Sequence, residues 1–172
     1  MNTIEFKENL MRLSPKKLQG LFVEYLKQVE NLTVSDNIHY SLNSGSKKIT
    51  VRCSRPFKEI KSKNFLEQLQ TANSLVSIKE NSKFLCNLQQ IKQFHSDEYY
   101  CSLLFDEAVY IFKLSNHNLN TDKTIGYLNY QHYGNPAEGQ LHISHKNVKS
   151  LIENYLYKRV TYSQLLNFAK KL

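Results

Sequence analysis

Cationic side chains are the residues of this sequence whose type and spacing point most clearly to chemistry. The segment 47–63 has a local charge of +6, because seven Lys and Arg residues stand against one acid, Glu59. A second segment, 145–172, has a local charge of +5 around the single acid Glu153. The whole chain carries +8, so its positive charge is concentrated in these two stretches. Neutralising phosphates releases condensed counterions, so the pattern favours a nucleic-acid partner, with a solvated Lys-rich face as the alternative. The cations of the first segment expected at DNA phosphates are Lys47, Lys48, Arg52, Arg55, Lys58, Lys61 and Lys63.

Polar side chains of the segment 127–140 form a second candidate contact. Asn129, Gln131 and His132 have the donor and acceptor types that read the edges of bases. Ordinary loop polarity explains the same composition. The sequence therefore nominates these three residues for nucleic-acid binding without deciding between the two interpretations.

Other chemistries find little support in the residue patterns. The sequence has no phosphate-binding glycine loop, no HExxH and no GxSxG. His142 and His145 are three residues apart, and the pattern places them across a strand end and a helix start, which favours polar surface residues over metal ligands. Cys53, Cys86 and Cys101 lie in apolar strand patterns, where inert buried thiols are the norm.

The elements that must position these residues follow from periodicity and capping signals. Ser14 and Pro15 are typical of a helix start, and the apolar spacing then predicts a helix to about residue 30. In the segment 47–55, alternation predicts a strand with Lys48, Thr50, Arg52 and Ser54 on one face and Ile49, Val51 and Cys53 on the other. The other predicted elements are helices at 4–11, 64–72 (Phe65, Leu66 and Leu69 inward), 144–158 and from 161, strands at 38–42, 84–91, 99–105, 108–114 and 140–143, a turn at 43–45 and a loop at 115–139.

Length and composition set the fold class. A chain of 172 residues fits one domain, predicted over 1–172, and the order of elements favours an α+β or α/β fold with a central mixed sheet between N- and C-terminal helices. Apolar stretches are only a few residues long, against the roughly 20 of a membrane span. The N-terminus has no signal-peptide pattern and the three cysteines no disulfide framework, so a reduced, cytoplasmic protein is expected.

One arrangement of acids and strands resembles a known family. Glu24 lies on the predicted helix 15–30, Asp36 directly precedes a predicted strand, and TVRCS follows at 50–54. Gln89 and Gln90 then precede the strand pair CSLLFDEAVYIFKLS, which leads into a loop rich in Gly, His and Asn. This order resembles the PD-(D/E)XK nuclease superfamily, the fold of most type II restriction endonucleases. The resemblance implies a restriction-endonuclease-like fold, Mg²⁺ held by carboxylates at Glu24 and Asp36, and duplex DNA as the substrate.

The chain departs from that family where the catalytic Glu-X-Lys belongs. Thr50 stands in the Glu position and cannot supply an anionic metal ligand, and Arg52 stands in the Lys position and cannot lose its proton. The tripeptide Glu59-Ile60-Lys61 has the correct chemistry, so Glu59 is an alternative metal ligand and Lys61 its catalytic partner.

Three functions therefore stay open at this point. The first is a Mg²⁺-dependent endonuclease of duplex DNA that acts as a homodimer. The second is a catalytically inactive relative that binds nucleic acid or serves as a partner subunit. The third is an unrelated α+β interaction protein.

Overall fold

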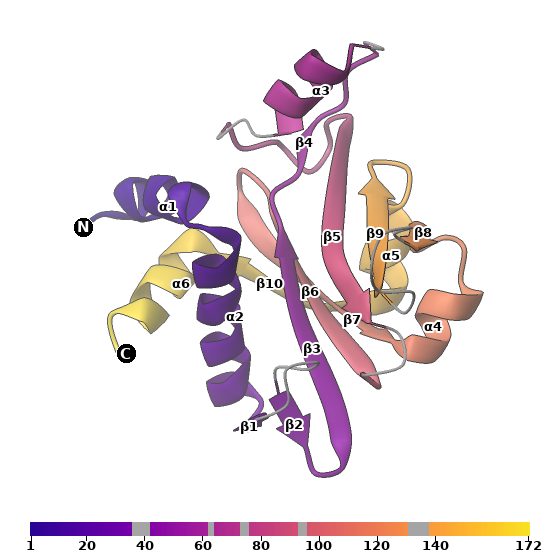
Figure 1. Ribbon diagram of the computed structural model, residues 1–172. Coiled ribbons are helices and arrows are strands. Elements are labelled where there is room, and N and C mark those ends of the chain that lie inside the picture. Colours follow the sequence, from indigo (N-terminus) through magenta and orange to yellow (C-terminus); the bar gives the residue numbers. More distant parts are fainter. Residues whose placement is uncertain (36–41, 62–63, 73–75, 93–95, 131–137) are drawn as a thin grey trace.

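The chain folds around a central six-stranded sheet that has helices on one face and a second, four-stranded sheet on the other (Figure 1). The computed structural model describes residues 1–35, 42–61, 64–72, 76–92, 96–130 and 138–172. The helices are α1 (Thr3–Arg12), α2 (Pro15–Val29), α3 (Phe65–Ala72), α4 (Asn116–Thr121), α5 (Val148–Tyr155) and α6 (Tyr162–Ala169). The architecture is α+β with a central mixed sheet, as the element order predicts.

The central sheet, sheet A, contains one parallel pair. Its strands, in order across the sheet, are β1 (Thr33–Val34), β2 (Leu42–Ser44), β3 (Lys47–Ser54), β6 (Glu98–Leu104), β7 (Ala108–Ser115) and β10 (Leu156–Thr161). The pair β3 and β6 is parallel and every other neighbouring pair is antiparallel. The second sheet, sheet B, is antiparallel throughout, and its strands in order are β4 (Phe57–Lys58), β5 (Phe84–Lys92), β9 (Glu138–Ser144) and β8 (Tyr127–Tyr130).

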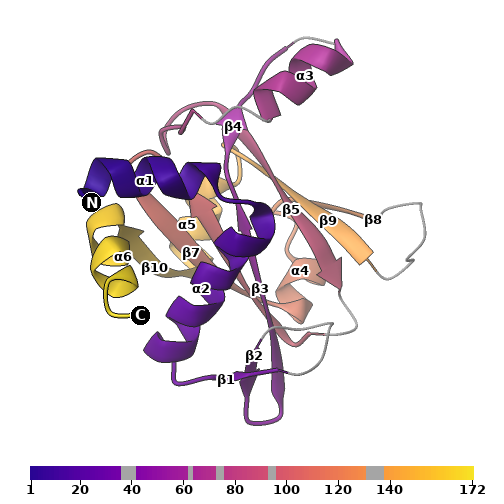
Figure 2. The ribbon, with the colours of Figure 1, turned by 60° about the vertical axis from the view of Figure 1, so that its left-hand side comes forward.

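Apolar side chains cover both faces of sheet A and form two cores. The first core lies against α1, α2 and α6, and the second lies between sheet A and the layer formed by sheet B, α4 and α5. Figure 2 shows this order of layers from the side. Nearly every residue of β6 and β7 is buried, which is the pattern of strands covered on both faces and explains their continuous apolar sequence.

The hairpin of β2 and β3 sets the position of β3. Ser44 pairs with Lys47, so the turn consists of Gly45 and Ser46. Gly45 has φ +59°, a conformation that glycine adopts without steric cost at the first position of such a turn. The predicted turn at 43–45 is therefore wrong by a residue or two, because Asn43 and Ser44 belong to β2. The predicted strand 38–42 lies, except for Leu42, outside the described residues.

Two predicted boundaries are wrong for identifiable reasons. The predicted loop 115–139 contains α4 and β8; α4 begins at a capping box in which Ser115 and Asn118 bond reciprocally. The predicted helix 144–158 is α5 followed by β10. Apolar spacing continues into β10, but the edge of β7 offers a backbone ladder, and Val160 and Thr161 are β-branched residues that favour a strand.

Helix α3 has two apolar side chains at the surface, and the side chain of Leu69, also predicted to point inward, lies outside the described residues. Phe65 is 75% exposed and Leu66 59% exposed, so the prediction that they point inward is wrong. In both ribbon views α3 stands away from the two sheets (Figures 1 and 2). None of the described helices is both long and apolar enough to cross a membrane.

Candidate nucleic-acid interface

A cleft of about 560 Å³ opens where the end of β3, the start of α2 and the strand β5 meet. Figure 1 shows these three elements side by side. Lys16, Arg52 and Arg55 are the cations of its lining, and we refer to it as the cationic cleft. Gln19, Asn87, Gln89 and Gln90 contribute amides, and Leu18, Cys53 and Phe57 contribute apolar surface.

Helix α2 brings a positive end to the cleft. Ser14 caps the helix by accepting a bond from the Lys17 backbone N–H, and Pro15 occupies the first helical position. The first turn of α2 contains no acid but has Lys16 and Lys17. Unpaired N–H groups already give a helix N-terminus a partial positive charge, so two lysines there raise the potential further. Such an end attracts an anion.

Arg52 lies along the wall formed by β5. Its Nε donates to the carbonyl oxygens of Gln89 (3.1 Å) and Gln90 (3.3 Å), and its Nη2 donates to the Gln90 carbonyl at 3.1 Å. Its Nη1 donates to the carbonyl of Val51 at 2.9 Å. β4 pairs only with Phe84 and Leu85 of β5, so this guanidinium meets β5 at an edge that β4 does not cover.

Arg55 lines the cleft directly after the end of β3. Its Nη1 donates to the carbonyl of Met11 near the end of α1, and its side chain is half-buried. The buried Pro56 follows and ends β3. Arg55 is therefore fixed between the first helix and the last residue of the strand.

The cleft combines positive charge with neutral polar groups. Of the residues described as lining it, three are cations, four have amides and none has a carboxylate. Burial raises the pKa of the Cys53 thiol to about 12, so the thiol is neutral at physiological pH. Asn87 Oδ1 lies 2.7 Å from His142 Nδ1, and burial lowers the pKa of His142, which favours its neutral form. The described lining of the cleft thus has three positively charged side chains and no negatively charged one.

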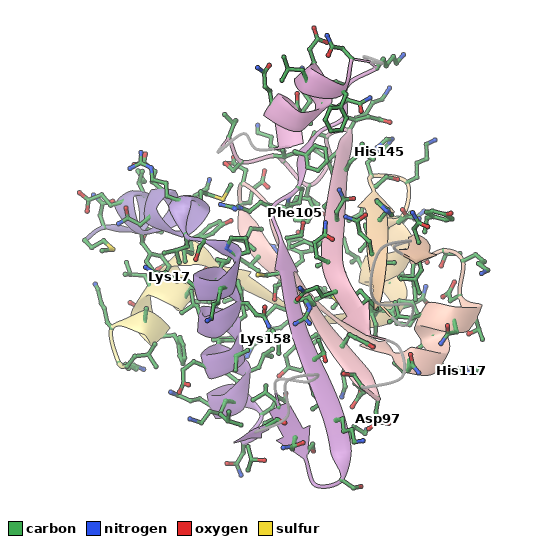
Figure 3. The ribbon with its side chains drawn as sticks, in the orientation of Figure 1. Lys17, Asp97, Phe105, His117, His145 and Lys158 are labelled. Carbon is green, nitrogen blue, oxygen red and sulfur yellow. The ribbon has the colours of Figure 1, made fainter. Side chains whose placement is uncertain are left out.

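The residues nominated for metal binding lie apart from the cleft where they are described. Glu24 sits further along α2, where its Oε1 accepts from Gln28 Nε2 at 3.1 Å and pairs with Lys27 Nζ at 3.6 Å. Glu59 Oε2 lies 3.7 Å from Nδ1 of His145, which Figure 3 shows beside the start of β5. Asp36 lies outside the described residues. Within the described part of the chain, no three His, Cys, Asp or Glu side chains gather in a group that could hold a metal ion.

The nominated strand residues Thr50 and Arg52 have different surroundings. Thr50 is fully buried, and its hydroxyl is hydrogen-bonded to that of Ser96, so this position is closed to solvent. The reason is that sheet B and its adjoining segments cover this face of sheet A. Arg52, two residues further on, reaches the cleft.

The cations of segment 47–63 do not share one surface. Lys47 Nζ pairs with Glu98 Oε1 at 2.9 Å, and the backbone N–H of Lys48 donates to Asp97 Oδ2 at 2.8 Å. Figure 3 places Asp97 at the end of β3 opposite the cleft. Lys58 lines a separate hollow beside α3 that includes Ile60 and Val76, and Lys61 is exposed just beyond β4. Lys63 lies outside the described residues.

Asn129, from the candidate base-reading segment, lies two strands away from β5, the strand that lines the cleft. Asn129 is in β8, where it pairs with Gln140, and β8 forms the edge of sheet B opposite β4. The prediction that Asn129 belongs to a loop is therefore wrong. Gln131 and His132 lie outside the part of the chain that is described.

Sequence reasoning missed Lys16, Gln19 and Phe57 as members of the site. The signal for Lys16 was present, because the Ser14-Pro15 start fixes the first turn of a helix at Lys16 and Lys17. The sequence does not indicate which strand faces that turn.

No protein-family model matches the chain, and the curated proteins and the solved structures contain no significant match to it either.

Proposed function

We propose that this protein binds nucleic acid through the cationic cleft, with the phosphate backbone against Lys16 and Arg55. One observation carries the proposal: cations from α2, from β3 and from the residue after β3 meet in one hollow whose described lining has no carboxylate. Cations that share one hollow repel each other, and a phosphate backbone relieves that repulsion. The amides of the lining supply neutral donors and acceptors beside the charge.

Duplex DNA is the first ligand to test, in keeping with the resemblance to restriction endonucleases. Three further features stay predictions from the sequence. They are Mg²⁺-dependent cleavage of the DNA, assembly as a homodimer or with a partner subunit, and a cytoplasmic location. Running the binding assay with Mg²⁺ and with EDTA also tests cleavage, since metal-dependent hydrolysis gives discrete shorter fragments on a gel.

Substitution of two neighbouring lysines tests the cleft directly. Lys16 lines the cleft, whereas Lys17 follows it on the same helical turn and does not belong to the lining (Figure 3). We expect Lys16→Gln to weaken DNA binding severalfold at about 50 mM salt and to reduce the slope of log K against log[salt] by about one, as for a lost phosphate contact. Fluorescence anisotropy with a labelled duplex over a salt series measures both quantities.

Lys17→Gln is the matched control, because it removes the same charge from the same turn. A Lys17→Gln protein with the larger loss of affinity would move the interface away from the cleft. Failure of the unmodified protein to bind duplex or single-stranded DNA at about 50 mM salt would contradict the proposal as a whole.

A further inference from the structure

Strand β5 carries a bulge at the wall of the cationic cleft. Leu88 pairs with Leu141 and Ile91 pairs with Gly139, so β5 has one residue more than β9 over this interval. Within the bulge Gln90 has φ +56°, a left-handed conformation that glycine or asparagine adopts at lower cost than glutamine. Bulges of this kind redirect side chains, and they are frequent beside binding sites.

Arg52, which belongs to the strand β3 of sheet A, holds this bulge in place. Its Nε and Nη2 donate to the carbonyls of Gln89 and Gln90, the two residues at which the register shifts. A guanidinium can bridge two carbonyls because its donors form a rigid fork. Arg52 is therefore a positioning residue for the amide-bearing wall, in addition to contributing charge.

The two walls of the cleft differ in chemistry. Lys16 and Arg55 lie on the side of the α2 start and offer cationic donors. Gln89 and Gln90 lie on β5 and offer amides, and Phe57 offers an aromatic side chain between the cleft and α3. Phosphate prefers the first wall, whereas the edge of a base prefers amides and its face prefers an aromatic ring.

The size of the cleft favours an unpaired nucleotide over a paired one. A volume of about 560 Å³ lies within the usual range of sites for one small ligand. A double helix can lie across such a hollow but cannot present the edge and face of a paired base inside it, because those surfaces are stacked and paired.

We infer that the cationic cleft receives one unpaired nucleotide of a nucleic-acid strand. Its phosphate lies against Lys16 and Arg55, and its base lies against the Gln89 and Gln90 side chains that the Arg52-held bulge presents. This inference rests on the proposed function, and it adds that the protein distinguishes unpaired from paired bases.

Three labelled DNA probes of equal length test the inference by anisotropy: a paired duplex, the same duplex with one unpaired nucleotide, and a single strand. We expect the two probes with unpaired bases to bind about tenfold tighter than the paired duplex, which is the discrimination that one good amide contact to a base edge gives. A free nucleoside monophosphate serves as competitor, and we expect it to displace the single strand only at concentrations far above the strand's Kd. Displacement at equal concentration would overturn the assignment to a strand.

Two variants separate the walls. Gln90→Gly adopts a positive φ freely and removes only the amide side chain, so we expect it to lose at least half of the tenfold preference for unpaired probes. Lys16→Gln lowers the affinity for all three probes alike, and Lys17→Gln keeps the preference. Circular dichroism and thermal unfolding check that Gln90→Gly is folded.

The outcomes for the inference and for the proposed function are distinct. Equal affinity for paired and unpaired probes, or an unchanged preference in folded Gln90→Gly, would overturn the unpaired-nucleotide site and leave nucleic-acid binding intact. Absence of binding to all three probes would overturn both.

Discussion

At the scale of single residues, Arg52 shows that the geometry of a cation decides its role. The guanidinium contacts the carbonyls of Val51, Gln89 and Gln90 from three nitrogen atoms. The contacts with Gln89 and Gln90 join sheet A to sheet B at the point where β5 carries its bulge. A lysine carries the same charge on one nitrogen atom and cannot form this bridge.

We expect Arg52→Lys to lower the free energy of unfolding by about 2 kcal/mol, because it leaves carbonyls on the wall of the cleft without a charged donor. Urea denaturation followed by circular dichroism measures the change. Arg12→Lys, at the exposed end of α1, is the matched control and should change the free energy of unfolding by less than about 0.5 kcal/mol. Equal stability of the two variants would show that the positive charge of Arg52 stabilises the fold and that the geometry of its guanidinium donors does not.

At the scale of elements, two glycines differ in whether their surroundings have room for a side chain. Gly126 precedes β8 with φ +153°, and a Cβ there would lie 2.4 Å from the backbone oxygen of His142 in β9. The close approach of β8 to β9 therefore requires glycine. Gly20 lies inside α2 and on its exposed side, and a Cβ there would meet nothing within 4 Å.

We accordingly expect alanine to have opposite effects at these positions. Gly126→Ala should destabilise the protein by about 2 kcal/mol, because backbone must move to admit the methyl group. Gly20→Ala should stabilise it by about 0.5–1 kcal/mol through helix propensity. Thermal unfolding of both variants beside the unmodified protein checks the signs, and a stabilising Gly126→Ala would contradict the described packing of β8 on β9.

At the scale of the whole molecule, a few long-range polar contacts hold the layers together and depend on pH. The Asp106 side chain, in the turn between β6 and β7, accepts from Lys7 of α1 and from Ser77 Oγ at 2.7 Å. Bonds from Lys7 and Ser77 lower the pKa of Asp106 below its ordinary value of 3.8. Burial lowers the pKa of His142 below 6.5.

Both shifts make the folded protein less stable in acid. In each case the unfolded chain binds the proton at a higher pH than the folded chain, so stability falls as pH decreases. The contribution of His142 is complete above pH 6.5 and is lost below it. The contribution of Asp106 is complete above about pH 3.8 and is lost as pH falls through its lower folded pKa.

We therefore expect Asp106→Asn to narrow the difference in stability between pH 7 and pH 3, by lowering stability at pH 7 more than at pH 3. Urea denaturation at both pH values measures that difference. Glu107→Gln, the exposed neighbouring carboxylate, is the control and should leave the difference close to that of the unmodified protein. A larger fall in stability between pH 7 and pH 3 in Asp106→Asn than in the unmodified protein would contradict a stabilising ion pair between Asp106 and Lys7.

Much of the fold was predictable because it depends on neighbours in the chain. The Ser14-Pro15 start and the amphipathic spacing of α2, the helix predicted at α1, and the apolar strands β6 and β7 depend on local sequence, and the structure confirms them. β10 was not predictable in this way, because the edge of β7 decides it from a distant part of the chain.

The candidate site divides along the same line. The sequence by itself determined that positive charge is concentrated and that Arg52 and Arg55 belong to one strand end, since charge and alternation are properties of adjacent residues. Only the tertiary structure decided that Glu98 pairs with Lys47, that Thr50 is enclosed, and that Lys16 joins Arg52 and Arg55 against the bulge of β5. The physical reason is that each of these outcomes is a contact between segments far apart in sequence, which forms only when the helices and the two sheets pack together.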